Sequence, residues 1–143
     1  MNPSAPAVEL FFLSFERNNA CDDLSTILAQ FADPFMAAGP QGTQAVRAGD
    51  FALALPKRKQ FFAGLGHRST ALVSLEQTPL DARYVLAKTR WRMTFIRNQD
   101  QPQELLVDST YILDTGSEAA RIVFYLAHKD IMVLLKDKGL LPA

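Results

Sequence analysis

The stretch that decides the fold is "YVLAKTRWRMTF", residues 84–95, in which two kinds of side chain alternate. The odd positions hold Val85, Ala87, Thr89, Trp91, Met93 and Phe95, and the even positions hold Tyr84, Leu86, Lys88, Arg90, Arg92 and Thr94. A period of two predicts a β-strand with one mainly apolar face and one basic face. We predict that Trp91 points to a helix-covered interior, and that Arg90 and Arg92 point to solvent or to a subunit interface. A bulge in this strand would exchange the two faces beyond it.

Three more extended segments accompany this strand. Residues 69–78, 83–97, 104–114 and 119–128 are separated by short polar connectors, which are typical of antiparallel neighbours. Fully extended at ~3.3 Å per residue, residues 83–97 would span about 45–50 Å. A compact domain of this length has a diameter of roughly 37 Å. The strand must therefore coil, bend or bulge, and long bent strands make a half-open cone that has an interior.

Helical periodicity precedes the strands. Residues 3–19 carry apolar side chains at helical spacing. A second short helix is predicted after Asp22–Asp23, with Phe31 on its apolar stripe, and Asp33–Pro34 is expected to end it. Residues 37–50 ("AAGPQGTQAVRAGD") predict a loop or a short strand because glycines interrupt them.

Two more helices are expected, one before the strands and one after them. The third spans about 50–65, with Pro56 in its first turn and Gly66 just beyond its end. A short last helix begins after Asp130, which caps it, and Gly139 ends it. The whole pattern predicts one α+β domain over residues 1–143, with helices packed on one face of a strongly curved, mostly antiparallel sheet.

Composition excludes several classes of function. Of the 143 residues, 15 are Lys or Arg and 15 are Asp or Glu, so no net charge attracts a polyanion. A nucleic-acid partner is disfavoured further because aromatic side chains for base stacking are sparse on the basic face. Cys21 is the single cysteine, and His67 and His128 lack a metal-binding spacing, so we predict no disulfide, metal or cofactor. The chain reads as cytoplasmic, since it has neither a signal-peptide pattern nor an apolar run long enough for a membrane span.

Three stretches carry a resemblance to a known family: "RYVLAKTRWRMTF", "VDSTYIL" and "RIVFYLAHKDIMVLLKDKGL". With the order and length of the predicted elements, they resemble bacterial members without assigned activity in the SnoaL-like branch of the nuclear transport factor 2-like (NTF2-like) superfamily. The resemblance implies a cone-shaped, cystatin-like α+β domain with a pocket between the concave sheet and the helices. It also implies frequent homodimers through the outer sheet face. Members include isomerases, dehydratases, cyclases and non-catalytic binding domains, and no catalytic pair transfers to this chain.

Asp108 is the best single carboxylate for chemistry. In the predicted strand 104–114 it shares a face with Leu106, Thr110 and Ile112. If that face lines the pocket, loss of solvation would raise the pKa of Asp108 and make it a general base near neutral pH. The alternative is that Asp108 faces solvent or pairs with Arg90 or Arg92 on a neighbouring strand.

Two tyrosines and a histidine are weaker catalytic candidates. Tyr111 and Tyr125 could donate hydrogen bonds to a developing oxyanion, or could simply bury their rings. By alternation each lies on the face opposite to Asp108 or His128 of its own strand. His128 could titrate at a pocket mouth, or could serve only as a local hydrogen-bonding residue before the last helix.

The basic stretch "PKRKQFF", residues 56–62, also has two readings. Lys57, Arg58 and Lys59 sit near the predicted start of a helix, where cations are mildly unfavourable. They indicate either contact with an anion or a solvated helix face.

These observations lead to a pocket protein that binds a small, largely apolar molecule. The predicted pocket-lining residues are Phe12, Phe35, Trp91, Met93, Phe95, Tyr111 and Tyr125. The leading hypothesis adds a metal-free isomerase, cyclase or dehydratase reaction by general acid–base catalysis. The alternative is a non-catalytic module that binds a ligand or a protein and forms a homodimer through the outer sheet face.

Overall fold

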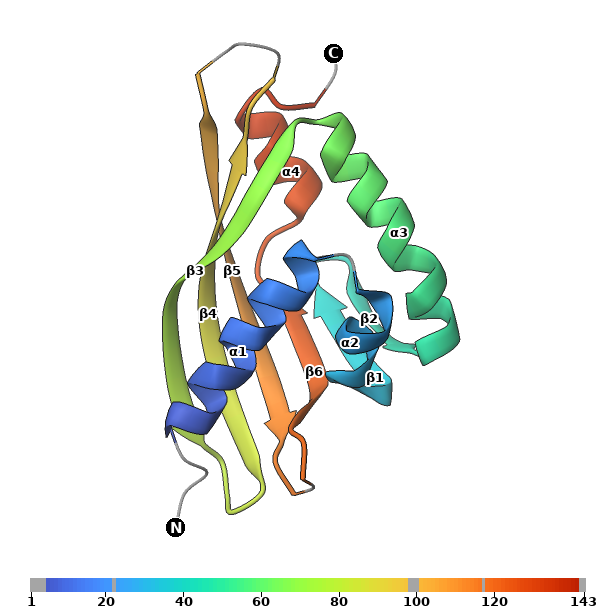
Figure 1. The fold of residues 1–143 in the computed structure, drawn as a ribbon, viewed down its shortest axis with the longest axis vertical. Helices are drawn as coiled ribbons and strands as arrows, with labels where there is room; N and C mark the ends of the chain where they lie inside the picture. The colour runs from blue at the N-terminus through green and yellow to red at the C-terminus, as the bar shows by residue number, and fades with distance from the viewer. Residues whose placement is uncertain (1–4, 22, 98–100, 117, 142–143) are drawn as a thin grey trace.

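The computed structural model describes residues 5–21, 23–97, 101–116 and 118–141. Within them, four helices and six strands follow one another in the order α1 (Ala5–Ala20), α2 (Leu24–Ala29), β1 (Phe31–Gly39), β2 (Gly42–Val46), α3 (Ala48–Gly64), β3 (His67–Pro79), β4 (Tyr84–Phe95), β5 (Gln103–Asp114), β6 (Arg121–Ala127) and α4 (Ile131–Asp137) (Figure 1). None of these helices is long and apolar enough to cross a membrane.

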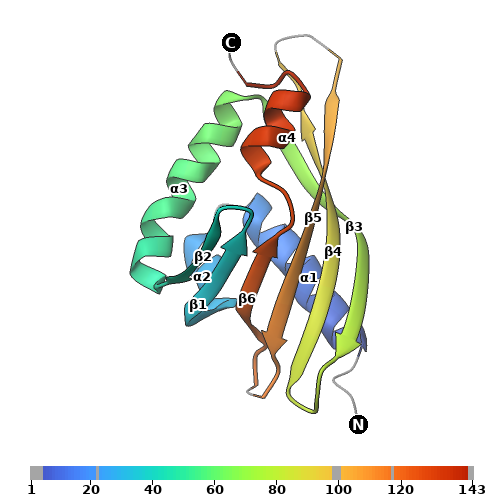
Figure 2. The same cartoon turned by 180° about the vertical axis from the view of Figure 1, so that it is seen from behind.

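All six strands belong to one curved sheet with the strand order β2-β1-β6-β5-β4-β3. Strands β3 to β6 form the predicted antiparallel meander. Strand β1 pairs antiparallel with β2 and parallel with β6, so residues 37–50 contain most of a hairpin that extends the sheet. Helix α1 lies across one side of the sheet, and the view from behind shows β4 and β5 in front of it (Figures 1 and 2). The predicted α+β class is confirmed.

Strand β4 has the two faces that its sequence predicts. From Val85 to Phe95 every odd position is buried, and Lys88, Arg90 and Arg92 are exposed. Trp91, at 6% exposure, lies inside. The pairing of β4 with β5 runs without a register shift, so no bulge exchanges the faces. The register irregularities of the sheet lie in β3, near Ser69 and Val73, between β5 and β6, and between β1 and β6.

The second helix is shorter than predicted. Helix α2 ends at Ala29, Gln30 is its C-cap, and Phe31 is already the first residue of β1. Placing Phe31 on the helical stripe was therefore wrong, and Asp33–Pro34 lies inside β1 instead of ending the helix. The reason is tertiary, because the amide of Ile122 in β6 donates a 2.8 Å hydrogen bond to the Gln30 carbonyl and draws the chain into the sheet.

Helix α3 begins earlier than predicted. Since it starts at Ala48, Pro56 lies in its interior and not in its first turn. The helix is held mainly at its two ends. Phe51 packs on Phe31 and Phe35 at one end, and Phe62 packs on Phe95 at the other. Gly66 follows the helix with φ +89°, as expected of a residue after a helix C-cap.

The last helix follows its sequence signals. The Asp130 side chain accepts a hydrogen bond from the Met132 amide at 2.9 Å, and Gly139 adopts φ +69° beyond the end of α4. Leu135 is fully buried, and Ile131 and Leu134 pack beside it.

The hydrophobic core has two parts. One contains Val8, Phe12, Val85, Ala87, Trp91, Tyr111, Leu113 and Ile122, between α1 and the sheet. The other contains Phe62, Leu65, Met93, Phe95, Leu105, Leu135 and Leu140, where α3 and α4 meet β4 and β5. Strand β4 contributes to both parts, which explains why its pattern is the strongest in the chain.

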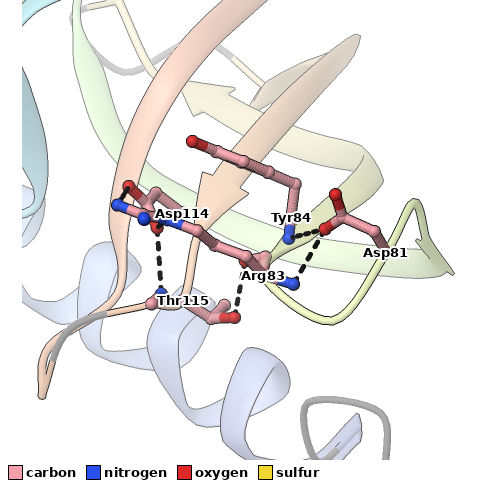
Figure 3. Close-up of polar contacts among 6 residues, drawn as sticks. Asp81, Arg83, Tyr84, Asp114 and Thr115 are labelled. Carbon is pink, nitrogen blue, oxygen red and sulfur yellow. Dashed lines mark hydrogen bonds and ion pairs between the residues drawn. The ribbon is translucent and has the colours of Figure 1, made fainter.

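The turns after β3 and after β5 are tied together by polar contacts (Figure 3). Both carboxylate oxygens of Asp114 accept hydrogen bonds from the Arg83 guanidinium, at 2.7 and 2.9 Å. The Thr115 amide and hydroxyl donate to the Arg83 carbonyl, and Asp81 accepts from the Arg83 and Tyr84 amides. The cluster is largely exposed and all its charges have partners, so it is a structural tie between two turns.

Candidate functional site

Buried hydroxyl groups lie on the concave face of the sheet. Thr89 of β4 is directly opposite Ser109 of β5. The Trp91 Nε1–H donates to Thr89 Oγ1 at 2.8 Å, and Thr89 Oγ1 donates to the Ser109 carbonyl at 3.0 Å. Thr89 Oγ1 and Ser109 Oγ are 3.2 Å apart. Alternation places these polar groups on the face that carries the aromatic core.

Two tyrosines continue this row. Tyr111 follows Ser109 on the same face, and its partner across the β5–β6 pairing is Tyr125. Their ring centroids are 5.2 Å apart. Burial raises the pKa of the Tyr111 phenol, and hydrogen bonding to the Ser109 side chain offsets this only in part. Tyr111 therefore stays protonated at neutral pH and remains a hydrogen-bond donor.

The predicted pocket-lining residues all lie on the concave side, where they contact one another and the helices. Phe12, Trp91 and Tyr111 belong to the first part of the core, with the half-buried Tyr125 packed against it, and Met93 and Phe95 belong to the second. Phe35 packs on Phe31 and Phe51 at the start of α3. Six of the seven are buried, and Tyr125 is the exception.

Half-buried rings form a margin around this packed interior. Besides Phe11 of α1, they include Phe15 of α1, Phe31 of β1, Phe51 of α3 and Tyr125 of β6. Phe15 connects the margin to the core, with ring centroids 5.9 Å from Trp91 and 6.0 Å from Tyr111. We call Phe15, Phe31, Phe51 and Tyr125 the aromatic margin.

The second half of α3 and the start of β3 bring two basic side chains, Arg58 and His67, to the same side. The guanidinium carbon of Arg58 lies 4.9 Å from the ring centroid of the buried Phe62. The imidazole of His67 packs on Phe62 and Phe95, and its Nε2 lies 2.7 Å from Thr70 Oγ1. Burial lowers the pKa of His67, and the charges of Lys59 and Arg58 lower it further. His67 is therefore neutral at pH 7.

Asp108 lies on the opposite, outer face of the sheet. Its two carboxylate oxygens accept hydrogen bonds from the Arg90 guanidinium at 2.8 and 3.2 Å, and both side chains are 50% exposed. The ion pair with Arg90 lowers the pKa of Asp108. The carboxylate is thus ionised and paired, which is the alternative reading of its sequence position.

His128 shares a small hollow with Asp108. Its Nε2 lies 2.6 Å from Thr110 Oγ1. The hollow has a volume of about 70 Å³ and is lined by Leu106, Val107, Asp108, His128, Lys129 and Leu134. Pockets for drug-sized ligands usually measure roughly 300–1,000 Å³. This hollow is too small for such a ligand.

The three catalytic candidates are therefore divided between the two faces. Asp108 and His128 come together outside, and Tyr111 is inside. Sequence reasoning identified the tyrosines but missed the Thr89–Ser109 pair and the placement of His67. Alternation alone places Thr89 inside with Trp91, whereas its pairing with Ser109 depends on the register. Among the described residues, no group of three His, Cys, Asp or Glu side chains could hold a metal ion.

No protein-family model matches the sequence, and no curated protein matches it. Solved structures do match. The β subunit of benzoate 1,2-dioxygenase from Burkholderia mallei superposes with a TM-score of 0.73 at 12% identity, covering 94% of this chain and 95% of that one. A ketosteroid isomerase-like protein from Erwinia carotovora atroseptica gives 0.69 at 11% identity, covering 90% and 98%.

An NTF2-like protein of unknown function from Shewanella oneidensis gives a TM-score of 0.67 at 12% identity, covering 87% of this chain and 98% of that one. Other matching structures are described as having a cystatin-like fold. Identities this low establish the arrangement of the chain and no shared chemistry. Helices on the concave side of a six-stranded, mostly antiparallel curved sheet, superposing over nearly their whole length on these proteins, show that the chain has the NTF2-like fold.

Proposed function

We propose that the protein binds a small, largely apolar molecule on the concave side of the sheet, under α3. The observation that carries this proposal is the aromatic margin around a buried row of hydrogen-bonding groups. Half-buried rings offer apolar surface to a ligand, and a few fixed polar groups orient it, as in most small-molecule sites. The named neighbours, a dioxygenase β subunit and a ketosteroid isomerase-like protein among them, support a fold used with small molecules.

The proposed chemistry is recognition by hydrogen-bond donation. Tyr111 is the donor, because burial keeps its phenol protonated. Asp108 takes no part, since it is on the other face and paired with Arg90. Turnover by acid–base catalysis would need a base on the concave side, and His67 is the candidate because its lowered pKa keeps the imidazole neutral.

Calorimetric titration with bicyclic aromatic amides, alcohols and acids tests the binding claim. The matched variants are Tyr125→Leu, on the concave face of β6, and Phe124→Leu, its half-buried neighbour on the outer face. We expect saturable binding of one molecule per chain, weakened at least about tenfold by Tyr125→Leu, the equivalent of ~1.4 kcal/mol. Phe124→Leu should bind like the wild type. No binding at millimolar concentrations, or equal weakening by both variants, would refute the proposal.

A second function, self-association through the outer face, is favoured by a separate observation. Met36 of β1, 41% exposed, lies opposite Phe124 of β6, which in turn lies opposite Ile112 of β5. The strand pairing places these three apolar side chains next to one another on the outer face of the sheet. Contiguous apolar patches of this kind mark protein interfaces. We propose a homodimer that buries this patch.

Light scattering on Met36→Lys tests the homodimer. The control is Leu53→Lys on α3, which replaces a residue that is 69% exposed outside the patch. We expect dimers for the wild type and the control, and monomers for Met36→Lys. A wild-type chain that stays monomeric at high micromolar concentration would refute the dimer.

A further inference from the structure

Arg58 is held beside the proposed site by a contact with the core. Its guanidinium lies over Phe62, which is 7% exposed and packs on His67 and Phe95. A cation over an aromatic face is attracted to the ring, and that attraction keeps the guanidinium on the sheet side of α3. The positive charge of Arg58 acts on both Tyr111 and His67, lowering the pKa of each. The geometry places Arg58 against Phe62, and Phe62 contacts His67.

Arg58 is not a member of the ion pairs between residues that the structure describes. These ion pairs are Arg83–Asp114, Arg90–Asp108 and Arg92–Glu104. Asp108 and Glu104 lie on the outer face, and Asp114 is in the turn cluster of Figure 3. No carboxylate is among the charges that act on His67 or Tyr111.

A guanidinium held over an apolar ring is a suitable anchor for an organic anion. Hydrogen bonds between charged groups are roughly twice as strong as neutral ones, and Arg binds a carboxylate with two parallel hydrogen bonds. Of the two readings of "PKRKQFF", this arrangement favours contact with an anion for Arg58.

We propose that the molecule bound under α3 is an organic acid, a small aromatic or alicyclic carboxylate whose carboxylate group pairs with Arg58. Its apolar body lies against the aromatic margin, and Tyr111 donates to the end of the molecule that faces the sheet. This inference rests on the proposed function and narrows it to one class of ligand.

The experiment compares three ligands of nearly the same shape by calorimetry: 2-naphthoate, 2-naphthamide and 2-naphthylmethylamine. We expect the anion to bind at least about tenfold more tightly than the neutral amide and the amine to bind most weakly. Arg58→Gln should reduce the preference for the anion to about twofold or less, and Arg58→Lys should retain part of it. Lys57→Gln, an exposed neighbour on α3, is the control and should keep the full preference.

Each outcome separates the two claims. Equal binding of naphthoate and naphthamide would overturn the organic acid and leave the apolar site standing. A preference for the anion that survives Arg58→Gln would overturn the role of Arg58. If none of the three ligands binds the wild type, the proposed function fails and this inference fails with it. Melting temperatures of the variants confirm folding, since Arg58 and Lys57 are exposed.

Discussion

Replacing Gly66 with alanine should destabilise the protein more than any other glycine-to-alanine change considered below. Gly66 has φ +89°, a conformation that costs an L-residue about 1–2 kcal/mol. An added Cβ would also press on the Ile96 carbonyl group, at 2.9 Å from its carbon. The Ile96 amide donates a 2.8 Å hydrogen bond to the Gly66 carbonyl.

The expected loss follows from these two terms. Moving the Ile96 backbone weakens one hydrogen bond, which contributes about 0.5–1.5 kcal/mol, so the free energy of unfolding should fall by about 1.5–3.5 kcal/mol. Gly139→Ala isolates the conformational cost, because Gly139 has φ +69° and an open space around its added Cβ. Gly64→Ala, in α3 with equally open space, should stabilise by about 0.5–1 kcal/mol.

Urea unfolding followed by tryptophan fluorescence and by circular dichroism measures all three variants. If Gly66→Ala lost no more stability than Gly139→Ala, the close approach of the α3–β3 turn to the end of β4 would be wrong. The position of α3 over the sheet, on which the proposed site depends, would then need revision.

Three further predictions concern single side chains. Thr89→Val should lower the free energy of unfolding by about 1–3 kcal/mol, because the buried Trp91 Nε1–H loses its acceptor. Thr94→Val, on the outer face of β4, should have little effect. Equal losses of stability in chemical denaturation would contradict the inward position of the Thr89 hydroxyl. Because the pKa of His67 is lowered in the folded protein, the unfolded chain binds a proton at this residue more readily than the folded chain does. The free energy of unfolding should therefore fall as the pH drops from 7 through about 6.5 and below. His67→Gln should flatten this pH dependence in unfolding titrations. Asp108→Asn should leave the melting temperature and ligand affinity unchanged because its ion pair is exposed on the outer face; a loss of ligand affinity would place Asp108 in the site after all.

The elements with a strong internal period could be predicted from the sequence. The alternation in residues 84–95 placed Trp91 inside and Arg90 outside, and both placements are confirmed. Asp130 and Gly139 bounded the last helix because capping depends on neighbouring residues alone. In such places local chemistry and the overall fold require the same structure.

Elements defined by long-range pairing could not be predicted. Strand β1 is stabilised by parallel pairing with β6, about ninety residues away in the sequence, and nothing near Phe31 signals that partner. Pro56 led to a wrong prediction of where α3 begins, because proline in a helix is most common in the first turn. Helix α3 instead contains Pro56 in an exposed interior turn.

The candidate site was predictable in its aromatic residues and not in its polar ones. Alternation separated Tyr111 from Asp108, and the structure places them on opposite faces. The position of Arg58 over Phe62 and the effect of its charge on Tyr111 depend on how α3 lies over the sheet, which no local pattern of the sequence contains. The sequence therefore predicted the aromatic residues of the candidate site but not the charged residues that lie beside them.

The most direct test of a ligand site on the concave side is a crystal structure of the protein with 2-naphthoate. We predict density for the ring system against Tyr125 and Phe51, with the carboxylate at Arg58. Density only at the outer hollow beside Asp108 and His128, or a concave side that stays closed and empty at saturating ligand, would contradict the account.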